Sequence, residues 1–167
     1  MLRWLAEKIT SAAPEKGTIL ERTVRAQMDD ADGARIVAAI AGLLGTVAYA
    51  DRQYAAVEEE RIRQELARVH GLTTAGVDAI CTVLREHIVD ISTVEAPVYA
   101  RELLALADRE LRVEVLDALV DIAAADDEIT VAETNVLRLT ATALGLTQHD
   151  YNTAQSRHRE KLKVLRK

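Results

Sequence analysis

Two acidic pairs with the same spacing are the residues of this chain best suited to chemistry. Six residues separate Asp51 from Glu58, and six separate Asp126 from Glu133. Carboxylate oxygens are the ligands that hard divalent cations prefer. The pairs therefore predict a site for magnesium, calcium or zinc. The candidate metal ligands are Asp126, Asp127, Glu128 and Glu133 in the second copy, where we expect the stronger binding, and Asp51 and Glu58 in the first.

The helices around each pair give a physical reason for a cation. Asp51 and Asp126 are expected at the C-terminal ends of buried helices, where the helix dipole disfavours a carboxylate by a few tenths to about 1 kcal/mol. A cation, an arginine or backbone N–H groups of the next loop would offset that cost. Glu58 and Glu133 are expected in the first turn of the following helix, where a carboxylate is favoured.

A structural role is the alternative for the same residues. Thr130 and Glu133 have the spacing of a capping box, in which the glutamate returns to the backbone N–H of its own cap. Asp51 and Asp126 are suited to Asx turns. The first copy has Ala55 at the cap position and still has Glu58, which weakens an account by capping alone. An EF-hand is excluded, because its loop is longer and needs a glycine at the turn.

Hydrophobic periodicity predicts an all-α protein. No segment alternates with a period of two, so no sheet is expected. A chain turn is predicted at Glu95 to Pro97, because proline disfavours helix. Helices are expected at about 2–12, 18–28, 33–50, 57–70, 74–91, 98–107, 108–125 and 131–144, with a last one from 147.

The chain carries an internal repeat. Val47 to Asp51 aligns with Ile122 to Asp126, and the tripeptide Gly-Leu-Thr follows at 71–73 and again at 145–147. Duplicated helical pairs tend to pack about a pseudo-twofold axis. We therefore expect a compact bundle of two related helix–loop–helix halves, about 33–92 and 98–166, around the buried apolar helices 33–50 and 108–125. Residues 1–28 would form a separate N-terminal helical segment, and 29–167 the main domain.

Charge and composition limit the partners and the location. The net charge is −6, and residues 29–156 contain ten basic and twenty-three acidic side chains. Such a surface repels nucleic acid and attracts cations or basic proteins. The single cysteine, Cys81, excludes an internal disulfide and suits the cytoplasm. The longest uncharged run, 36–50, is shorter than the ~20 residues of a membrane span. The N-terminal segment could instead contact a membrane surface or a partner peripherally.

Familiar enzyme motifs are missing. The chain has no Glu-x-x-His, His-Glu-x-x-His, Cys-x-x-Cys or phosphate-binding glycine loop. Cys81 and His158 each fall on an apolar stripe, which indicates structural roles. The acidic cluster leaves a carboxylate-dependent hydrolase as a minor alternative to a protein without catalytic activity.

At the repeat, the chain resembles the TerB-like family, named after tellurite-resistance proteins. The resemblance rests on Ala50-Asp51 with Glu58, on Ala125-Asp126 with Glu133, and on the Gly-Leu-Thr after each. It covers about residues 33–160. Arg52 and Asp127 stand where the family often has glycine, and the Arg52 guanidinium is expected to neutralise Asp51 or Glu58.

The resemblance implies an all-helical cytoplasmic protein linked with tellurite or chemical-stress response and with suspected metal binding. It implies no catalytic activity. From residues and resemblance together we expect a non-enzymatic module that binds a divalent cation at its acidic loops. The alternative is a protein–protein interaction adaptor whose acidic pairs are helix caps, with an unidentified protein partner. The sequence does not indicate an oligomeric state.

Overall fold

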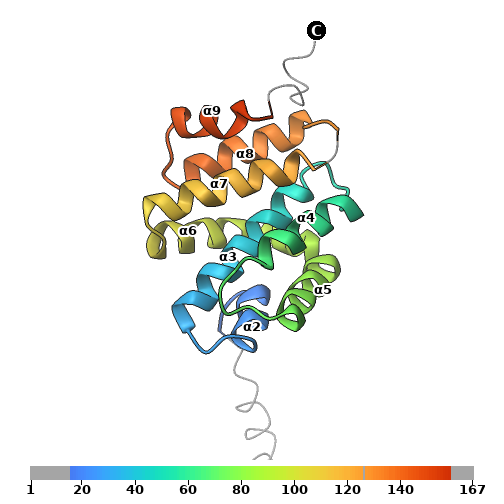
Figure 1. Cartoon of the computed structure of the whole chain (residues 1–167), viewed down its shortest axis with the longest axis vertical. Helices are drawn as coiled ribbons and strands as arrows, with labels where there is room; N and C mark the ends of the chain where they lie inside the picture. The colour runs from blue at the N-terminus through green and yellow to red at the C-terminus, as the bar shows by residue number, and fades with distance from the viewer. Residues whose placement is uncertain (1–15, 126, 159–167) are drawn as a thin grey trace, which may run out of the picture.

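The computed structural model of the chain describes residues 16–125 and 127–158, and the elements in this part are all helices (Figure 1). The fold is an all-α compact bundle, as predicted. The helices are α2 (Ile19–Arg25), α3 (Ala31–Ala48), α4 (Ala56–Leu66), α5 (Thr74–Asp90), a π-helix (Ile91–Glu95), α6 (Ala96–Leu106), α7 (Arg109–Ala123), α8 (Val131–Ala143) and α9 (Gln148–Ser156). The expected helix at 2–12 and the C-terminal part of the last helix lie outside the described residues.

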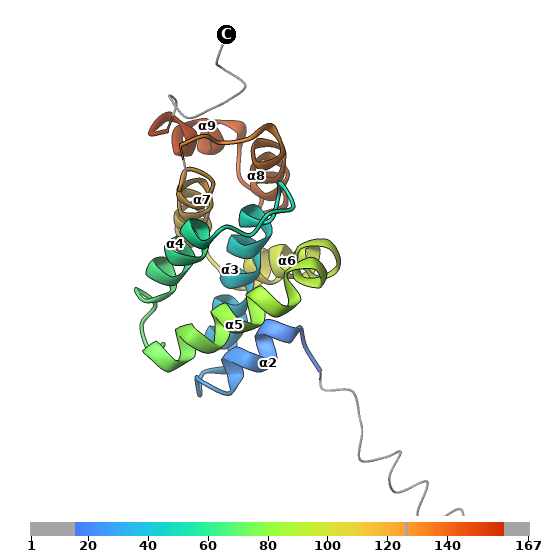
Figure 2. The same ribbon diagram turned by 90° about the vertical axis from the view of Figure 1, so that its right-hand side faces the viewer.

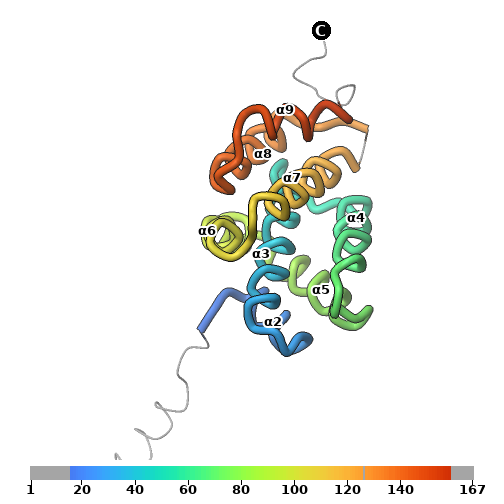
Figure 3. The backbone as a smooth tube through the Cα atoms, turned by 60° about the vertical axis from the view of Figure 1, so that its left-hand side comes forward, coloured from blue at the N-terminus to red at the C-terminus, as the bar shows by residue number. Residues whose placement is uncertain are grey.

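Helix α3 is the centre of the bundle. It contacts α2, α4, α5, α6, α7 and α8, and it lies in the middle of the molecule in every view (Figures 1 and 3). Its sequence is apolar nearly all round, which suits a helix that packs on several sides. By length and a mean hydropathy of 1.4 it also meets the criteria for a membrane span, and 61% of it is buried inside the protein, as in a core helix.

The expected contact between the two apolar helices is present, but the helices are not equivalent. Helix α7 packs against α3, α4, α8 and α9. It buries only part of its surface, with Val115, Leu116, Leu119, Val120, Ile122 and Ala123 on the covered side. One helix therefore forms the core, and the other covers it.

The predicted turn at Glu95 to Pro97 is wrong. Helix α5 continues through the π-helix directly into α6, and the chain changes direction over this stretch instead of looping (Figure 2). His87 has φ −123° and ψ 19°, outside the helical region, and marks a kink. Pro97 lies in the first two positions of α6, where a missing backbone N–H costs nothing. Proline therefore starts a helix here and does not interrupt one.

Candidate functional site

The two halves repeat their local geometry where the sequence repeats. Thr73 and Thr147 cap α5 and α9, each accepting a hydrogen bond from the backbone N–H three residues ahead. Gly71 and Gly145 have φ of +83° and +67°, a conformation that L side chains rarely adopt. Each Gly-Leu-Thr therefore turns the chain out of one helix and caps the next.

In the second acidic loop, Glu133 belongs to a complete capping box. The Thr130 backbone N–H donates to Glu133 Oε2 at 2.7 Å, and the Glu133 N–H donates to Thr130 Oγ1 at 3.1 Å. The Glu133 side chain is buried, with 1% exposure. Asp127 is exposed and Glu128 half-buried. Asp126 lies outside the described residues. The capping role that was the alternative for Glu133 is therefore confirmed, with Oε2 as the accepting atom.

The first loop has half of this arrangement. The Ala55 backbone N–H donates to Glu58 Oε2 at 3.1 Å, while the alanine side chain can accept nothing in return. Glu58 is also buried, with 3% exposure. Asp51 is exposed, and its Oδ1 accepts from the Gln53 N–H at 2.9 Å. The Asx turn predicted for Asp51 is therefore confirmed.

Arg52 departs from its expected role. Its guanidinium forms no ion pair within the described part of the chain, so the expected neutralisation of Asp51 or Glu58 is not found there. The backbone shows what the position requires instead. Arg52 has φ +64° and is the only non-glycine residue with positive φ among those described. It therefore adopts the conformation for which glycine is suited.

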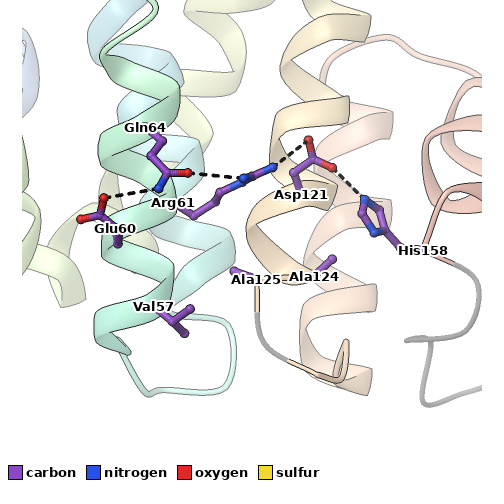
Figure 4. A pocket seen from close by; sticks show the side chains of 8 residues that line it. All are labelled: Val57, Glu60, Arg61, Gln64, Asp121, Ala124, Ala125 and His158. Carbon is purple, nitrogen blue, oxygen red and sulfur yellow. Dashed lines mark hydrogen bonds and ion pairs between the residues drawn. The ribbon is translucent and has the colours of Figure 1, made fainter.

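The start of the second loop faces the first helix–loop–helix unit across a pocket of about 340 Å³. Val57, beside Glu58, lies on one wall, and Ala125, beside Asp126 in the sequence, lies on the other (Figure 4). The full lining is Val57, Glu60, Arg61 and Gln64 of α4, Ala124, Ala125 and Asp121 from the end of α7, and His158. The fold thus brings both acidic loops to one side of the bundle.

Asp121 is the charged centre of this pocket, and the sequence did not identify it. Its carboxylate lies 2.7 Å from His158 Nε2 and 3.8 Å from Arg61 (Figure 4). It also lies 3.9 Å from Arg157. It therefore connects α4, α7 and the residues after α9. Asp121 is one of four acidic residues of α7, and the sequence pattern does not show which of them meets distant partners. Cys81 is buried, as predicted, and burial raises the pKa of its thiol.

The described carboxylates alone do not complete a metal site. Within residues 16–125 and 127–158, no group of three or more His, Cys, Asp or Glu side chains is placed to hold a metal ion. Glu58 and Glu133 are oxygen donors of the right kind, and each uses Oε2 at a helix cap.

The structure thus defines a class: an all-α bundle in which two helix–loop–helix units each carry an acidic loop. Comparison with known families assigns the chain to one family within this class. The model of the family described as tellurite resistance protein TerB matches residues 37–156, and the chain belongs to this family. The match runs from α3 to α9 and leaves out α2. No curated protein and no solved structure shows a significant match.

Proposed function

We propose that this protein is a non-enzymatic module of the TerB family that binds one divalent cation at its acidic loops, in a cytoplasmic response to tellurite or related chemical stress. The observation that carries the proposal is the pair of buried carboxylates. Glu58 and Glu133 come from equivalent positions of the two repeats, and each is almost fully buried. Carboxylate oxygens at these two equivalent positions are ligands of the kind that hard divalent cations prefer.

The charge of the surroundings supports a cation. Residues 29–156 carry twenty-three acidic and ten basic side chains, a difference of thirteen negative charges. Asp126 follows the C-terminal end of α7, where the helix dipole adds negative potential. The donors are all oxygen atoms, and such a set suits magnesium or calcium better than zinc. The proposed ligands are Asp126, Asp127, Glu128 and Glu133 in the second loop, where we expect the stronger binding, and Asp51 and Glu58 in the first.

Thermal melting and calorimetry with magnesium, calcium, zinc and manganese test the proposal. A bound cation stabilises the folded state by about 2.7 kcal/mol at a hundred times its Kd, so the melting temperature should rise with one of these metals. Asp126→Asn should abolish the rise. Asp90→Asn is the control, because it also removes one exposed negative charge and lies outside the acidic loops. No shift with any metal contradicts the proposal.

A second candidate, an interaction adaptor, is favoured by the complete capping box of Thr130 and Glu133, which gives that carboxylate a structural role without metal. Its test is a pull-down with chains truncated outside the bundle. Removal of 1–28 is unsuitable, because it takes away α2 with its buried Leu20 and Val24. Deletions of 1–15 and 159–167 are the appropriate variants. An adaptor should lose a partner with one of them, and unchanged binding partners count against it.

A further inference from the structure

An uncharged groove lies between α3, the π-helix, α6 and α8, and the acidic loops do not use it. Its volume is about 330 Å³, within the range of small binding pockets. Leu139 on its α8 wall is 72% exposed, unusually high for a leucine. The lining contains no charged side chain: Leu43, Thr46, Ser92, Thr93, Ala96, Pro97, Ala100, Val136, Leu139, Thr140 and Ala143.

The start of α2 is hydrogen-bonded to the residue that precedes two lining residues of this groove in the sequence. The Ile19 backbone N–H, in the first turn of α2, donates to Glu95 Oε1 at 3.2 Å. The Tyr99 hydroxyl donates to Glu95 Oε2 at 2.5 Å, so the glutamate is held from both sides. The next two residues after Glu95, Ala96 and Pro97, line the groove. The start of α2 is therefore attached to the helical turn that also supplies part of the groove lining.

The fifteen residues before the described chain have a matching composition. They include Leu2, Trp4, Leu5 and Ile9, and their two basic and two acidic side chains cancel. The twelve positions from Trp4 to Lys16 reach about 18 Å as a helix and about 40 Å when extended. A segment on so short a tether has an effective concentration in the millimolar range. It therefore competes well against a second protein molecule for the groove.

We propose that residues 1–15 bind back onto this groove within the same molecule, with Trp4 and its apolar neighbours covering Leu139. The groove and the segment are both apolar and without net charge, and a short stretch of chain joins the segment to α2. This proposal does not depend on cation binding, since it uses another face of α3 and α8.

Trp4 is the only tryptophan of the protein, so its fluorescence reports on this contact directly. In the full chain, its emission should lie at shorter wavelength than in a synthetic peptide of residues 1–15, with several-fold weaker quenching by iodide. Leu139→Glu should move the emission toward that of the peptide and restore quenching. Thr93→Glu, on the opposite wall, should do the same.

Val131→Glu is the matched control, because Val131 is 51% exposed on the same helix and does not line the groove. It should leave Trp4 unchanged, and far-UV circular dichroism should confirm that all variants fold. Peptide-like emission in the full chain, or emission insensitive to both groove variants, overturns the proposal. A change over roughly a hundredfold range of protein concentration indicates a second copy as occupant and also overturns it. A blue shift of the Trp4 emission that is seen only when lipid vesicles are added also overturns the proposal.

Discussion

Thr130 and Glu133 satisfy each other across the first turn of α8: each side chain accepts a hydrogen bond from the other residue's backbone N–H. The equivalent residues of the first repeat, Ala55 and Glu58, share one such bond. The backbone of Ala55, with φ −77° and ψ 149°, is nearly that of Thr130, with −71° and 163°. At the cap position, the first helix start therefore lacks the hydroxyl acceptor that Thr130 supplies in the second.

Ala55→Thr should complete the first capping box. The new hydroxyl would accept from the Glu58 N–H and raise the free energy of unfolding by about 1 kcal/mol, as N-cap residues typically do. Chemical denaturation measures the gain. Ala55→Val is the control, because it adds the same branching without an acceptor and should bring no gain. Conversely, Thr130→Val should cost about 1 kcal/mol. Equal effects of Thr and Val at position 55 contradict the interpretation.

Arg52→Gly should stabilise the protein. A left-handed conformation costs an L residue about 1–2 kcal/mol, and glycine avoids this at the expense of greater freedom in the unfolded chain. The expected net gain is about 0.5–1 kcal/mol in denaturant unfolding. Arg52→Ala separates this effect from charge, since it removes the guanidinium and keeps the strain. A loss of stability in the glycine variant would mean that the guanidinium has the greater role.

Gly42 and Gly33, both in α3, should respond oppositely to alanine. A Cβ at Gly42 would overlap the ring of Tyr99, which is 1% exposed and cannot move aside. Overpacking of this kind costs about 1–3 kcal/mol. A Cβ at Gly33 meets only the side chain of Asp30, which is exposed and flexible. Gly33→Ala should therefore gain about 0.5–1 kcal/mol of helix propensity. Thermal melts of the two variants give the comparison, and equal shifts argue against close packing of α3 on α6.

Asp121→Ala should loosen the residues that follow α9. The Asp121 side chain is 20% exposed and lies 2.7 Å from His158 Nε2, so its removal should cost about 1–2 kcal/mol. Arg61→Ala should cost less, because Arg61 lies 3.8 Å from Asp121 and its side chain is 38% exposed. Limited proteolysis should show earlier cleavage near residues 156–158 in Asp121→Ala alone. Equal sensitivity of both variants would contradict a central role of Asp121.

Stability should fall at alkaline pH through buried tyrosines. Burial, with the nearby charge of Glu59, raises the pKa of Tyr54, and burial, with the Glu95 hydrogen bond, raises the pKa of Tyr99. The folded state thus keeps these protons while the unfolded state loses them above its ordinary tyrosine pKa of about 10. The stabilisation is complete below that pH and declines above it. Urea unfolding at a series of pH values measures the decline.

Tyr54→Phe should flatten this decline without cost at neutral pH. The Tyr54 hydroxyl is buried with no hydrogen-bond partner among the described residues, so its removal should be neutral or gain about 1 kcal/mol. Tyr99→Phe should also reduce the decline but lose stability at neutral pH, because it gives up the bond to Glu95. Equal losses at neutral pH would indicate that Tyr54 has a partner.

Features determined by nearby residues could be predicted from the sequence. The helix periodicity, the caps at Thr73, Thr130 and Thr147 and the turns at Gly71 and Gly145 depend on contacts within a few positions. The joint at 91–97 was missed, because proline is suited both to breaking a helix and to starting one.

Contacts between distant segments were not predictable. Asp121 acquires its importance from Arg61, Arg157 and His158, which only the fold brings together. The pseudo-twofold relation of the halves stays a prediction, as does the metal set of Asp126, Asp127, Glu128, Glu133, Asp51 and Glu58.

The helical joint from α5 through α6 has a practical consequence for protein engineering. The Ser92 hydroxyl donates a hydrogen bond to the carbonyl of Ile88, and the Thr93 hydroxyl donates one to the carbonyl of Val89. Side-chain hydrogen bonds therefore reinforce the continuous helical backbone of the joint. An inserted residue there would rotate everything after it by about 100° relative to everything before. Fusion partners, tags and cleavage sites therefore belong outside this joint, and the two repeats cannot be cut apart at their midpoint.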